Sequence, residues 1–388
     1  MKKQFTAGDV AFMRRALALA ERGRGSTRPN PVVGAVIIRR GRVIAEGYHR
    51  RAGQPHAEIR ALQALKQVGG ARGATLYVNL EPCCHTGRTG PCTTALIDAG
   101  FARVVVGCRD PNPRVDGRGL ALLRRAGIRV DVGCLEDECL AANRAFAIWV
   151  RRRRPLVTLK VAATLDGYIA DGKARPRRAP AWITGAAARE AAHGLRAQHD
   201  AILVGAGTVA ADDPRLTVRL RRTRRGAATP LRVILDGRLR TSPAARVLPQ
   251  ARSGETTVVV GAAGAPQDRV RALERAGAEV VLLPGHRGRV PIARVLAWLA
   301  TLDVQSLLVE GGADVHGAFV RARLVDGVAF FMAPRLLGGG IPVASGAQLS
   351  LGRALPLGPM TVRPVGHDLL ITADVAGPAR SAAVPPML

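Results

Sequence analysis

The run RRRRPL at residues 151–156 divides the 388-residue chain into two parts. Four arginines and a proline interrupt regular secondary structure, and a new strand-like segment, VTLKVAATLDG, follows at once. On each side of the run, apolar strand-like segments alternate with helical ones, as in α/β layers. If the arginine run were only a solvated patch within one continuous domain, the renewed alternation of strands and helices after it would be less well explained. We therefore predict two α/β domains, at residues 1–150 and 155–375.

The N-terminal segment predicts a helix of the mature protein. Its lysines resemble those of a signal peptide, but Asp9, Arg14 and Arg15 interrupt the apolar region. Thr6 is the expected N-cap with Asp9 three residues on, and the expected apolar stripe is Val10, Met13, Leu17 and Ala20. No apolar run in the chain approaches the ~18 residues that a membrane-spanning helix needs. We expect no membrane partner and a cytoplasmic protein.

Hydrophobic patterning predicts the elements of each part. In the first part we expect a hairpin at 31–48, helices at 56–68 and 92–99, strands at 75–80 and 103–107, and a shorter helix–strand tail. In the second we expect strands at 157–162, 201–205, 231–236, 256–260, 279–283, 306–310, 328–334 and 369–375. The helices expected there lie at 185–197, before Gly277, at 291–300 and after Gly312.

The net charge of +29, from 58 Lys and Arg against 29 Asp and Glu, raises the alternative of a nucleic-acid-binding protein. Aromatic residues make up only 3% of the chain, however, and the arginines are spread along its whole length. We expect phosphate-bearing small molecules and no nucleic acid. Of the six cysteines, Cys108, Cys134 and Cys139 are expected to be buried apolar residues.

Four residues of the first part have the pattern of a catalytic zinc site. His56, Cys83 and Cys92 supply one nitrogen and two thiolates, which leaves a fourth tetrahedral position for water. Glu58 lies two residues after His56 and is placed to move protons between that water and a leaving amine. The order H-x-E, P-C, C is the signature of nucleobase deaminases. A structural zinc site is the alternative, and it would need Cys84 or His85 as a fourth ligand.

Eight residues, CHTGRTGP, separate Cys83 from Cys92. With TRPNPVVGAV, GYHRRAGQPHAE and DPNP, this loop resembles the deaminase domain of the bifunctional riboflavin-biosynthesis deaminase–reductase family, over residues 6–145. The resemblance implies a cytidine-deaminase-like fold, Zn²⁺ held by His56, Cys83 and Cys92, and Glu58 as the catalytic proton carrier. It also implies a phosphorylated pyrimidine substrate, with contacts from Asn30, His49 and His85. A role as hydrogen-bonded loop residues remains an equal alternative for the two histidines.

The second part contains SLLVEGGADVHGAF, a strand, a glycine pair and a helix that could approach a phosphate. The motifs LKVAATLDG, AWITG, LRAQHDAILVGAGTVAADDPRLTVR, RVILDG and APRLLGG resemble the reductase domain of the same family, which is similar to dihydrofolate reductase. That resemblance implies hydride transfer from NADPH. The implied cofactor contacts are Ala162, Trp182, Thr208, Asp212, Gly312, Ala313, Asp314, Val315, His316, Gly317 and Ala318. The implied substrate contacts are Lys160, Arg196, Leu216, Arg219 and Glu310, with Arg196 and Arg219 on the substrate phosphate.

Two positions depart from the family pattern. Pro180 stands where a serine usually contacts substrate, and Gly237 replaces the small hydroxyl residue after RVILD. They leave open a second hypothesis, a deaminase whose second domain binds ligand without reducing it. The resemblance also implies a homo-oligomer.

Overall fold

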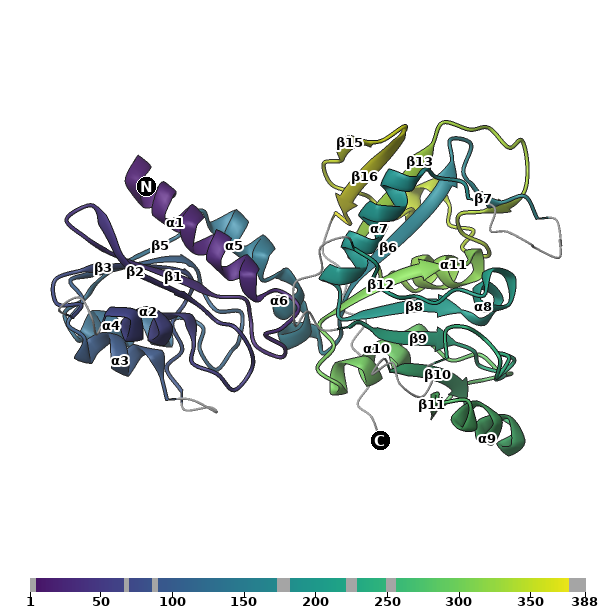
Figure 1. The fold of residues 1–388 in the computed structure, drawn as a ribbon, viewed down its shortest axis with the longest axis horizontal. Coiled ribbons are helices and arrows are strands. Elements are labelled where there is room, and N and C mark those ends of the chain that lie inside the picture. The colour runs from purple at the N-terminus through teal and green to yellow at the C-terminus, as the bar shows by residue number, and fades with distance from the viewer. Residues whose placement is uncertain are drawn as a thin grey trace. The chain divides into compact units, whose positions relative to one another are not determined.

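The computed structural model describes residues 5–65, 70–85, 90–172, 182–220, 229–248 and 256–376. The chain forms two compact units, Met1–Arg151 and Arg152–Leu388, so the division falls inside the RRRRPL run (Figure 1). Each unit is built from helices packed on a sheet, and the α/β class predicted for both is confirmed. None of the helices within the described ranges is long and apolar enough to cross a membrane.

Unit 1 contains a five-stranded sheet in the order β2-β1-β3-β4-β5. These strands are Arg42–Tyr48, Gly34–Arg39, Thr75–Leu80, Arg103–Cys108 and Arg129–Val132. β1 is antiparallel to β2 and β3, whereas β3, β4 and β5 are parallel. Helices α2 (Ala57–Leu65), α3 (Cys92–Asp98) and α4 (Arg118–Arg125) cover one face, and α1 (Ala7–Ala20) and α5 (Glu136–Ala142) the other (Figure 1). The unit also includes η1 (Glu21–Gly23) and most of α6 (Arg144–Arg152).

Helix α1 begins with the predicted cap. The Thr6 hydroxyl accepts a hydrogen bond from the Asp9 amide, and the Asp9 carboxylate accepts one from the Thr6 amide. The predicted apolar stripe is partly wrong, because the buried residues are Asp9, Met13, Ala16, Leu19 and Ala20. Asp9 is buried because Tyr77 and Arg103 both donate to its Oδ1, at 2.7 Å each. Burial alone would raise the pKa of Asp9, but these partners and Thr6 hold it well below its usual range.

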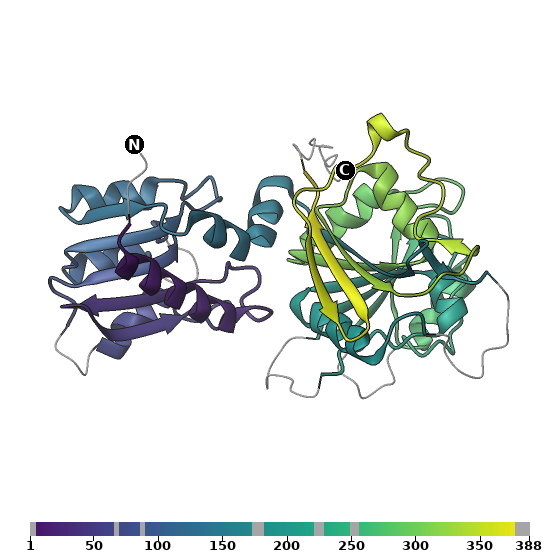
Figure 2. The same ribbon diagram turned by 90° about the horizontal axis from the view of Figure 1, so that it is seen from above.

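Unit 2 contains a nine-stranded sheet in the order β11-β10-β9-β8-β12-β6-β13-β16-β15. In that order the strands are Glu279–Leu283, Thr257–Ala262, Leu231–Leu235, Ala201–Gly205, Ser306–Gly311, Leu156–Thr164, Gly327–Ala333, Asp368–Asp374 and Thr361–Val365. The first seven are parallel, and β16 and β15 form an antiparallel hairpin at one edge (Figure 2). The short strands β7 (Tyr168–Ala170) and β14 (Ile341–Pro342) pair separately.

Helices cover both faces of this sheet. One core contains α10 (Ile292–Thr301) and α11 (Ala313–Ala322), and another contains α8 (Ala206–Asp212) and α9 (Gln267–Arg275). Successive residues of β8 alternate between these cores, with Leu203 in the first and Ile202 in the second. α7 (Ala186–Gln198) packs near β13 and β16, and η2 (Leu351–Arg353) lies in a later loop.

A buried ion pair fixes the start of two central strands. Both guanidinium arms of Arg154 donate to the Asp326 carboxylate, at 2.5 and 2.7 Å, and the two residues are 4% and 3% exposed. Asp326 also accepts a hydrogen bond from the Val157 amide at 2.8 Å. Because Arg154 precedes β6 and Asp326 precedes β13, this carboxylate links the beginnings of two adjacent parallel strands.

We predict that Asp326→Ala destabilises the protein by about 3–5 kcal/mol, because it leaves a buried guanidinium without its counter-charge. Urea unfolding of the full chain measures the effect. Glu46→Ala is the matched control, since Glu46 pairs with Arg15 at a similar 2.7 Å but with side chains 33% and 52% exposed. That control should cost at most about 1 kcal/mol. Equal losses in the two variants would contradict the prediction.

Candidate active sites of the two units

The candidate metal ligands of unit 1 meet at the ends of three elements. His56 directly precedes α2, Cys83 follows β3, and Cys92 is the first residue of α3 after Pro91. Their ligand atoms all lie within 4.8 Å of one another, with His56 Nδ1 3.3 Å from Cys92 Sγ and 3.5 Å from Cys83 Sγ. Ligand atoms around a tetrahedral zinc ion are separated by about 3.5 Å. The three residues therefore fit a zinc ion by both donor type and spacing.

Glu58 lies in the first turn of α2 and is 3% exposed. Burial, together with the nearby Cys83 thiolate, raises its pKa to about 7. A carboxyl group with a pKa near neutrality can both accept and release a proton. His56 lies just before the helix, whereas Glu58 lies in its first turn. The two side chains can therefore approach the same metal site although they are only two positions apart.

The two ligand thiols influence each other's ionisation. Their interaction lowers the pKa of Cys83 and raises that of Cys92. The Cys92 main-chain amide also donates to Cys83 Sγ at 3.4 Å. The main-chain amide at the start of α3 thus stabilises a thiolate at Cys83.

The other cysteines take no part in this group of described residues. Cys84 Sγ faces the Arg114 carbonyl at 4.0 Å. Cys108, Cys134 and Cys139 are buried and free, as predicted, and burial raises the pKa of each thiol.

Asn30 and His49 lie together beside the ligand His56. The His49 ring is 1% exposed and meets the His56 ring edge-on, with centroids 5.2 Å apart. His49 Nδ1 donates to the Pro55 carbonyl at 3.3 Å, so its Nε2 accepts from Asn30 Nδ2 at 3.0 Å. Burial lowers the pKa of His49 to about 4, which keeps the ring neutral. His85 is exposed at the edge of the described segment 70–85.

Sequence reasoning missed the role of Glu81, two residues before Cys83. Its buried carboxylate accepts hydrogen bonds from the amides of Gly117, Gly119 and Leu120, at 2.9–3.3 Å, at the start of α4. It also accepts from the Asp110 amide at 3.3 Å. These bonds fix the chain that leads into Cys83. The available signal was an acidic residue between the end of a strand-like segment and a Pro-Cys pair.

Unit 2 contains a cavity of about 2350 Å³ at the carboxyl ends of its parallel strands. Of the residues that the family resemblance assigns to the cofactor, it is lined by Ala162, Trp182, Thr208, Asp212, Gly312, Ala313, Asp314, Val315, His316 and Ala318. Of those assigned to the substrate, it is lined by Lys160, Arg196, Leu216, Arg219 and Glu310. Gly317 instead packs against Ser345, whose carbonyl leaves no space for a side chain there.

A charged group lies at the end of β12. Glu310, whose side chain is 6% exposed, accepts two hydrogen bonds from Arg196, at 2.5 and 2.7 Å, and lies 3.7 Å from Lys160 Nζ. Burial alone would raise the pKa of Glu310, but Lys160 and Arg196 lower it to about 2. The carboxylate therefore stays ionised and holds Lys160 at the edge of the cavity.

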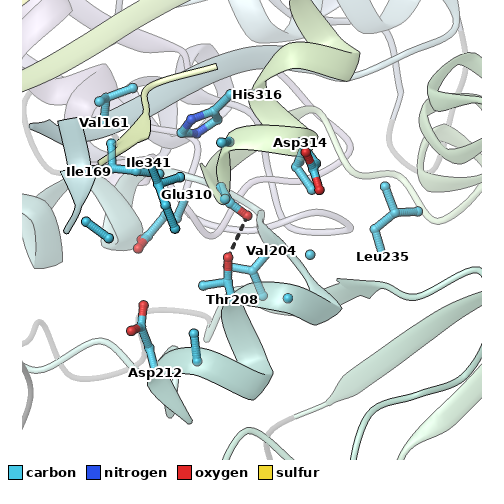
Figure 3. A pocket seen from close by; sticks show the side chains of 18 of the residues that line it. Val161, Ile169, Val204, Thr208, Asp212, Leu235, Glu310, Asp314, His316 and Ile341 are labelled. Carbon is cyan, nitrogen blue, oxygen red and sulfur yellow. Dashed lines mark hydrogen bonds between the residues drawn. The ribbon is translucent and has the colours of Figure 1, made fainter. Parts of the chain in front are cut away.

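The glycine pair after Glu310 forms the turn into α11. Gly311 and Gly312 have φ of +93° and +86°, and a side chain on Gly312 would meet Thr208 Oγ1 at 2.8 Å. Thr208 donates to the Gly311 carbonyl at 3.0 Å, so α8 is tied to the turn (Figure 3). The glycines leave the main-chain amides at the start of this ten-residue helix open to approach. Such amides fit a phosphate group of a dinucleotide.

The structure explains one of the two departures from the family pattern. A Cβ on Gly237 would lie 2.1 Å from the Gly288 carbonyl oxygen, so the backbone at 288 occupies the place of a side chain. Pro180, the other departure, lies outside the described residues.

Comparisons with known proteins identify the family. The family model for the RibD C-terminal domain matches residues 155–371, and that for the cytidine and deoxycytidylate deaminase zinc-binding region matches residues 7–108. The riboflavin biosynthesis protein RibD of Aquifex aeolicus is 40% identical over 364 residues, covering 94% of this chain and 97% of that protein. The chain belongs to the RibD family. RibD of Escherichia coli is 41% identical over 342 residues, covering 85% of this chain and 89% of its own.

Solved structures agree with the RibD assignment over both units. Acinetobacter baumannii RibD is similar with a TM-score of 0.82 and 36% identity, covering 95% of this chain and 99% of its own. A Thermotoga maritima diaminohydroxyphosphoribosylaminopyrimidine deaminase/5-amino-6-(5-phosphoribosylamino)uracil reductase gives a TM-score of 0.82 at 37% identity, with the same coverages. The chain thus joins a zinc-dependent deaminase to a reductase, as the sequence motifs predict.

We predict that Gly237→Ser, which restores the usual hydroxyl residue, destabilises unit 2 by about 1–3 kcal/mol, because its Cβ collides with the Gly288 carbonyl. The midpoint of thermal unfolding, followed by circular dichroism, measures the loss. Gly352→Ser is the matched control, because a Cβ at position 352 would meet open space, and it should leave the midpoint unchanged. An unaltered midpoint in Gly237→Ser would show that the turn at 288 moves freely.

Proposed function

We propose that this RibD protein performs two consecutive reactions on one phosphorylated pyrimidine. Unit 1 would hydrolyse the 2-amino group of 2,5-diamino-6-(ribosylamino)-4(3H)-pyrimidinone 5′-phosphate and release ammonia. Unit 2 would then reduce the ribosyl group of the product to ribityl with NADPH. The observation that carries the proposal is the His56, Cys83 and Cys92 cluster beside a buried Glu58, in a chain that also holds a reductase cavity.

In the deamination, different residues of unit 1 would bind the metal, transfer the proton and contact the pyrimidine. His56, Cys83 and Cys92 would hold Zn²⁺, which lowers the pKa of a bound water to about 7 when present. Glu58 would take a proton from that water and pass it to the departing amine, a role suited to its pKa of about 7. Asn30, whose amide is oriented by His49, would present its remaining polar groups to the pyrimidine.

In the reduction, the residues of unit 2 bind and orient both partners. The turn at Gly311 and Gly312 would receive a phosphate of NADPH, which supplies the hydride when bound. Glu310 holds Lys160 at the cavity edge, where its ammonium can approach the reacting sugar. Arg219 would contact the substrate phosphate.

We also propose a cytoplasmic location, which agrees with the six free cysteines. A homo-oligomeric assembly is proposed from the family relationship.

The decisive experiment supplies the diaminopyrimidine ribosyl phosphate and NADPH to the full-length protein, and follows ammonia and NADPH together. We expect ammonia release and NADPH oxidation in equal amounts. A zinc chelator should stop ammonia release while leaving NADPH oxidation on supplied deaminated substrate intact. Ammonia release without NADPH oxidation would favour the second hypothesis, a deaminase with a non-reducing second unit. The absence of both signals would overturn the proposal.

We predict that Glu58→Gln keeps its zinc but lowers the rate of deamination by about 10²–10⁴-fold, because an amide cannot carry the proton. Metal analysis and ammonia release measure the two parts of the prediction. Cys84→Ser is the matched control, since Cys84 lies outside the ligand cluster, and it should retain deamination. Loss of zinc in Glu58→Gln would instead assign Glu58 to holding the metal site.

A further inference from the structure

Two arginines of the unit 2 cavity differ in how many of their donors are already used. Arg196 gives Nε and Nη2 to Glu310 and Nη1 to the Thr217 carbonyl, at 2.9 Å. Its planar fork is therefore directed at protein acceptors. Arg219 is exposed at the cavity wall, and its contacts within the described chain are with a histidine. Arg219 is thus the better placed of the two to meet an incoming phosphate.

That histidine is His193, half-buried on α7. The Arg219 main-chain amide lies 3.3 Å from His193 Nδ1, and Arg219 Nη2 lies 3.3 Å from Nε2. Arg219 can only donate in both contacts, and a neutral imidazole accepts at one ring nitrogen only, so His193 accepts one of these two hydrogen bonds in each of its tautomers. The tautomer protonated on Nδ1 leaves Nε2 free to accept from the guanidinium. One imidazole therefore contacts both the backbone and the guanidinium of the same arginine. These contacts restrain the position of the Arg219 backbone and the direction of its side chain.

Only a neutral imidazole can accept either hydrogen bond, since both nitrogens of the charged ring are donors. Burial, followed by the positive charges of Arg196 and Arg219, lowers the pKa of His193, while Glu310 and the Thr217 carbonyl act in the opposite direction. The ring is consequently uncharged near neutral pH. The other end of this loop segment is fixed by Leu216, whose side chain is 4% exposed and packs in the apolar core with Val209. Between Leu216 and His193, the backbone leading to Arg219 is held at two points.

We propose that His193 is a positioning residue of the reductase site, which holds the Arg219 guanidinium toward the 5′-phosphate of the substrate. This inference rests on the proposed function, since it assigns the phosphate of that substrate to Arg219. A preoriented guanidinium loses less side-chain freedom when it binds an anion, so the benefit falls on substrate binding and not on hydride transfer.

The test uses steady-state reduction of the deaminated ribosyl phosphate by the full-length protein. His193→Leu should raise KM for this substrate roughly tenfold, the value of one hydrogen bond to a charged donor, with kcat and the KM for NADPH unchanged. Inorganic phosphate, used as a competitive inhibitor, should bind about tenfold more weakly to the variant. His193→Gln, whose side-chain oxygen can replace Nε2 as the acceptor, should recover most of the affinity.

A double-variant cycle separates positioning from a direct contact. If His193 acts through Arg219, then His193→Leu combined with Arg219→Ala should be no worse than Arg219→Ala alone. His367→Leu is the matched control, because His367 is exposed in the turn between β15 and β16, and it should behave as the wild type.

The outcomes distinguish this inference from the function on which it rests. An active wild type together with an unchanged substrate KM in His193→Leu overturns the positioning role alone. The positioning role is also overturned if His193→Leu changes kcat and the KM for NADPH as much as it changes the KM for the substrate. It is overturned as well if the losses of the two single variants multiply in the double variant. A wild type that fails to reduce the deaminated substrate overturns the proposed function first. If His193→Leu does not fold, His193→Gln and the phosphate inhibition of the wild type and Arg219→Ala decide the question.

Discussion

The buried Asp326 carboxylate sets the geometry on which the reductase unit depends. By binding Arg154 and the Val157 amide, it fixes the first residues of β6 beside the first residues of β13. From that point, parallel pairing places β6 against β12 as well, with Leu159 opposite Val309. The next residues along the two strands are Lys160 and Glu310, which form the charged pair at the cavity. The strand register that brings them together is therefore set by the Arg154–Asp326 ion pair at the opposite end of the strands.

The two units contain buried glutamates whose surroundings give them opposite properties. Glu58 lies near a thiolate and without a cation bonded to it among the contacts described, so burial raises its pKa to about 7. The Glu310 side chain is 6% exposed, but Lys160 and Arg196 lower its pKa to about 2. The first carboxyl group can exchange a proton near neutrality, whereas the second is a fixed negative charge. The same residue type thus serves proton transfer in one unit and placement of a cation in the other.

The sequence predicted most of the regular elements and the residues of the metal cluster, because both depend on local patterns. The strands at 75–80, 201–205 and 279–283 occur where apolar residues and turn signals place them. The strand β15 was missed, since it is exposed over four of its five residues and contains Pro364. The α1 stripe was partly wrong because Tyr77 and Arg103, far along the chain, bury Asp9. Glu81 and His193 act on residues 36 to 39 and 26 positions away, which no local pattern reveals.

The close approach of Gly237 and Gly288 also limits which residues this chain can carry there. The backbone at 288 fills the volume that a serine would take at 237, so neither position can change by itself without strain. A side chain at 237 would fit only if the backbone at 288 moved away. The glycine at 237 is therefore the residue that the path of the backbone at 288 requires.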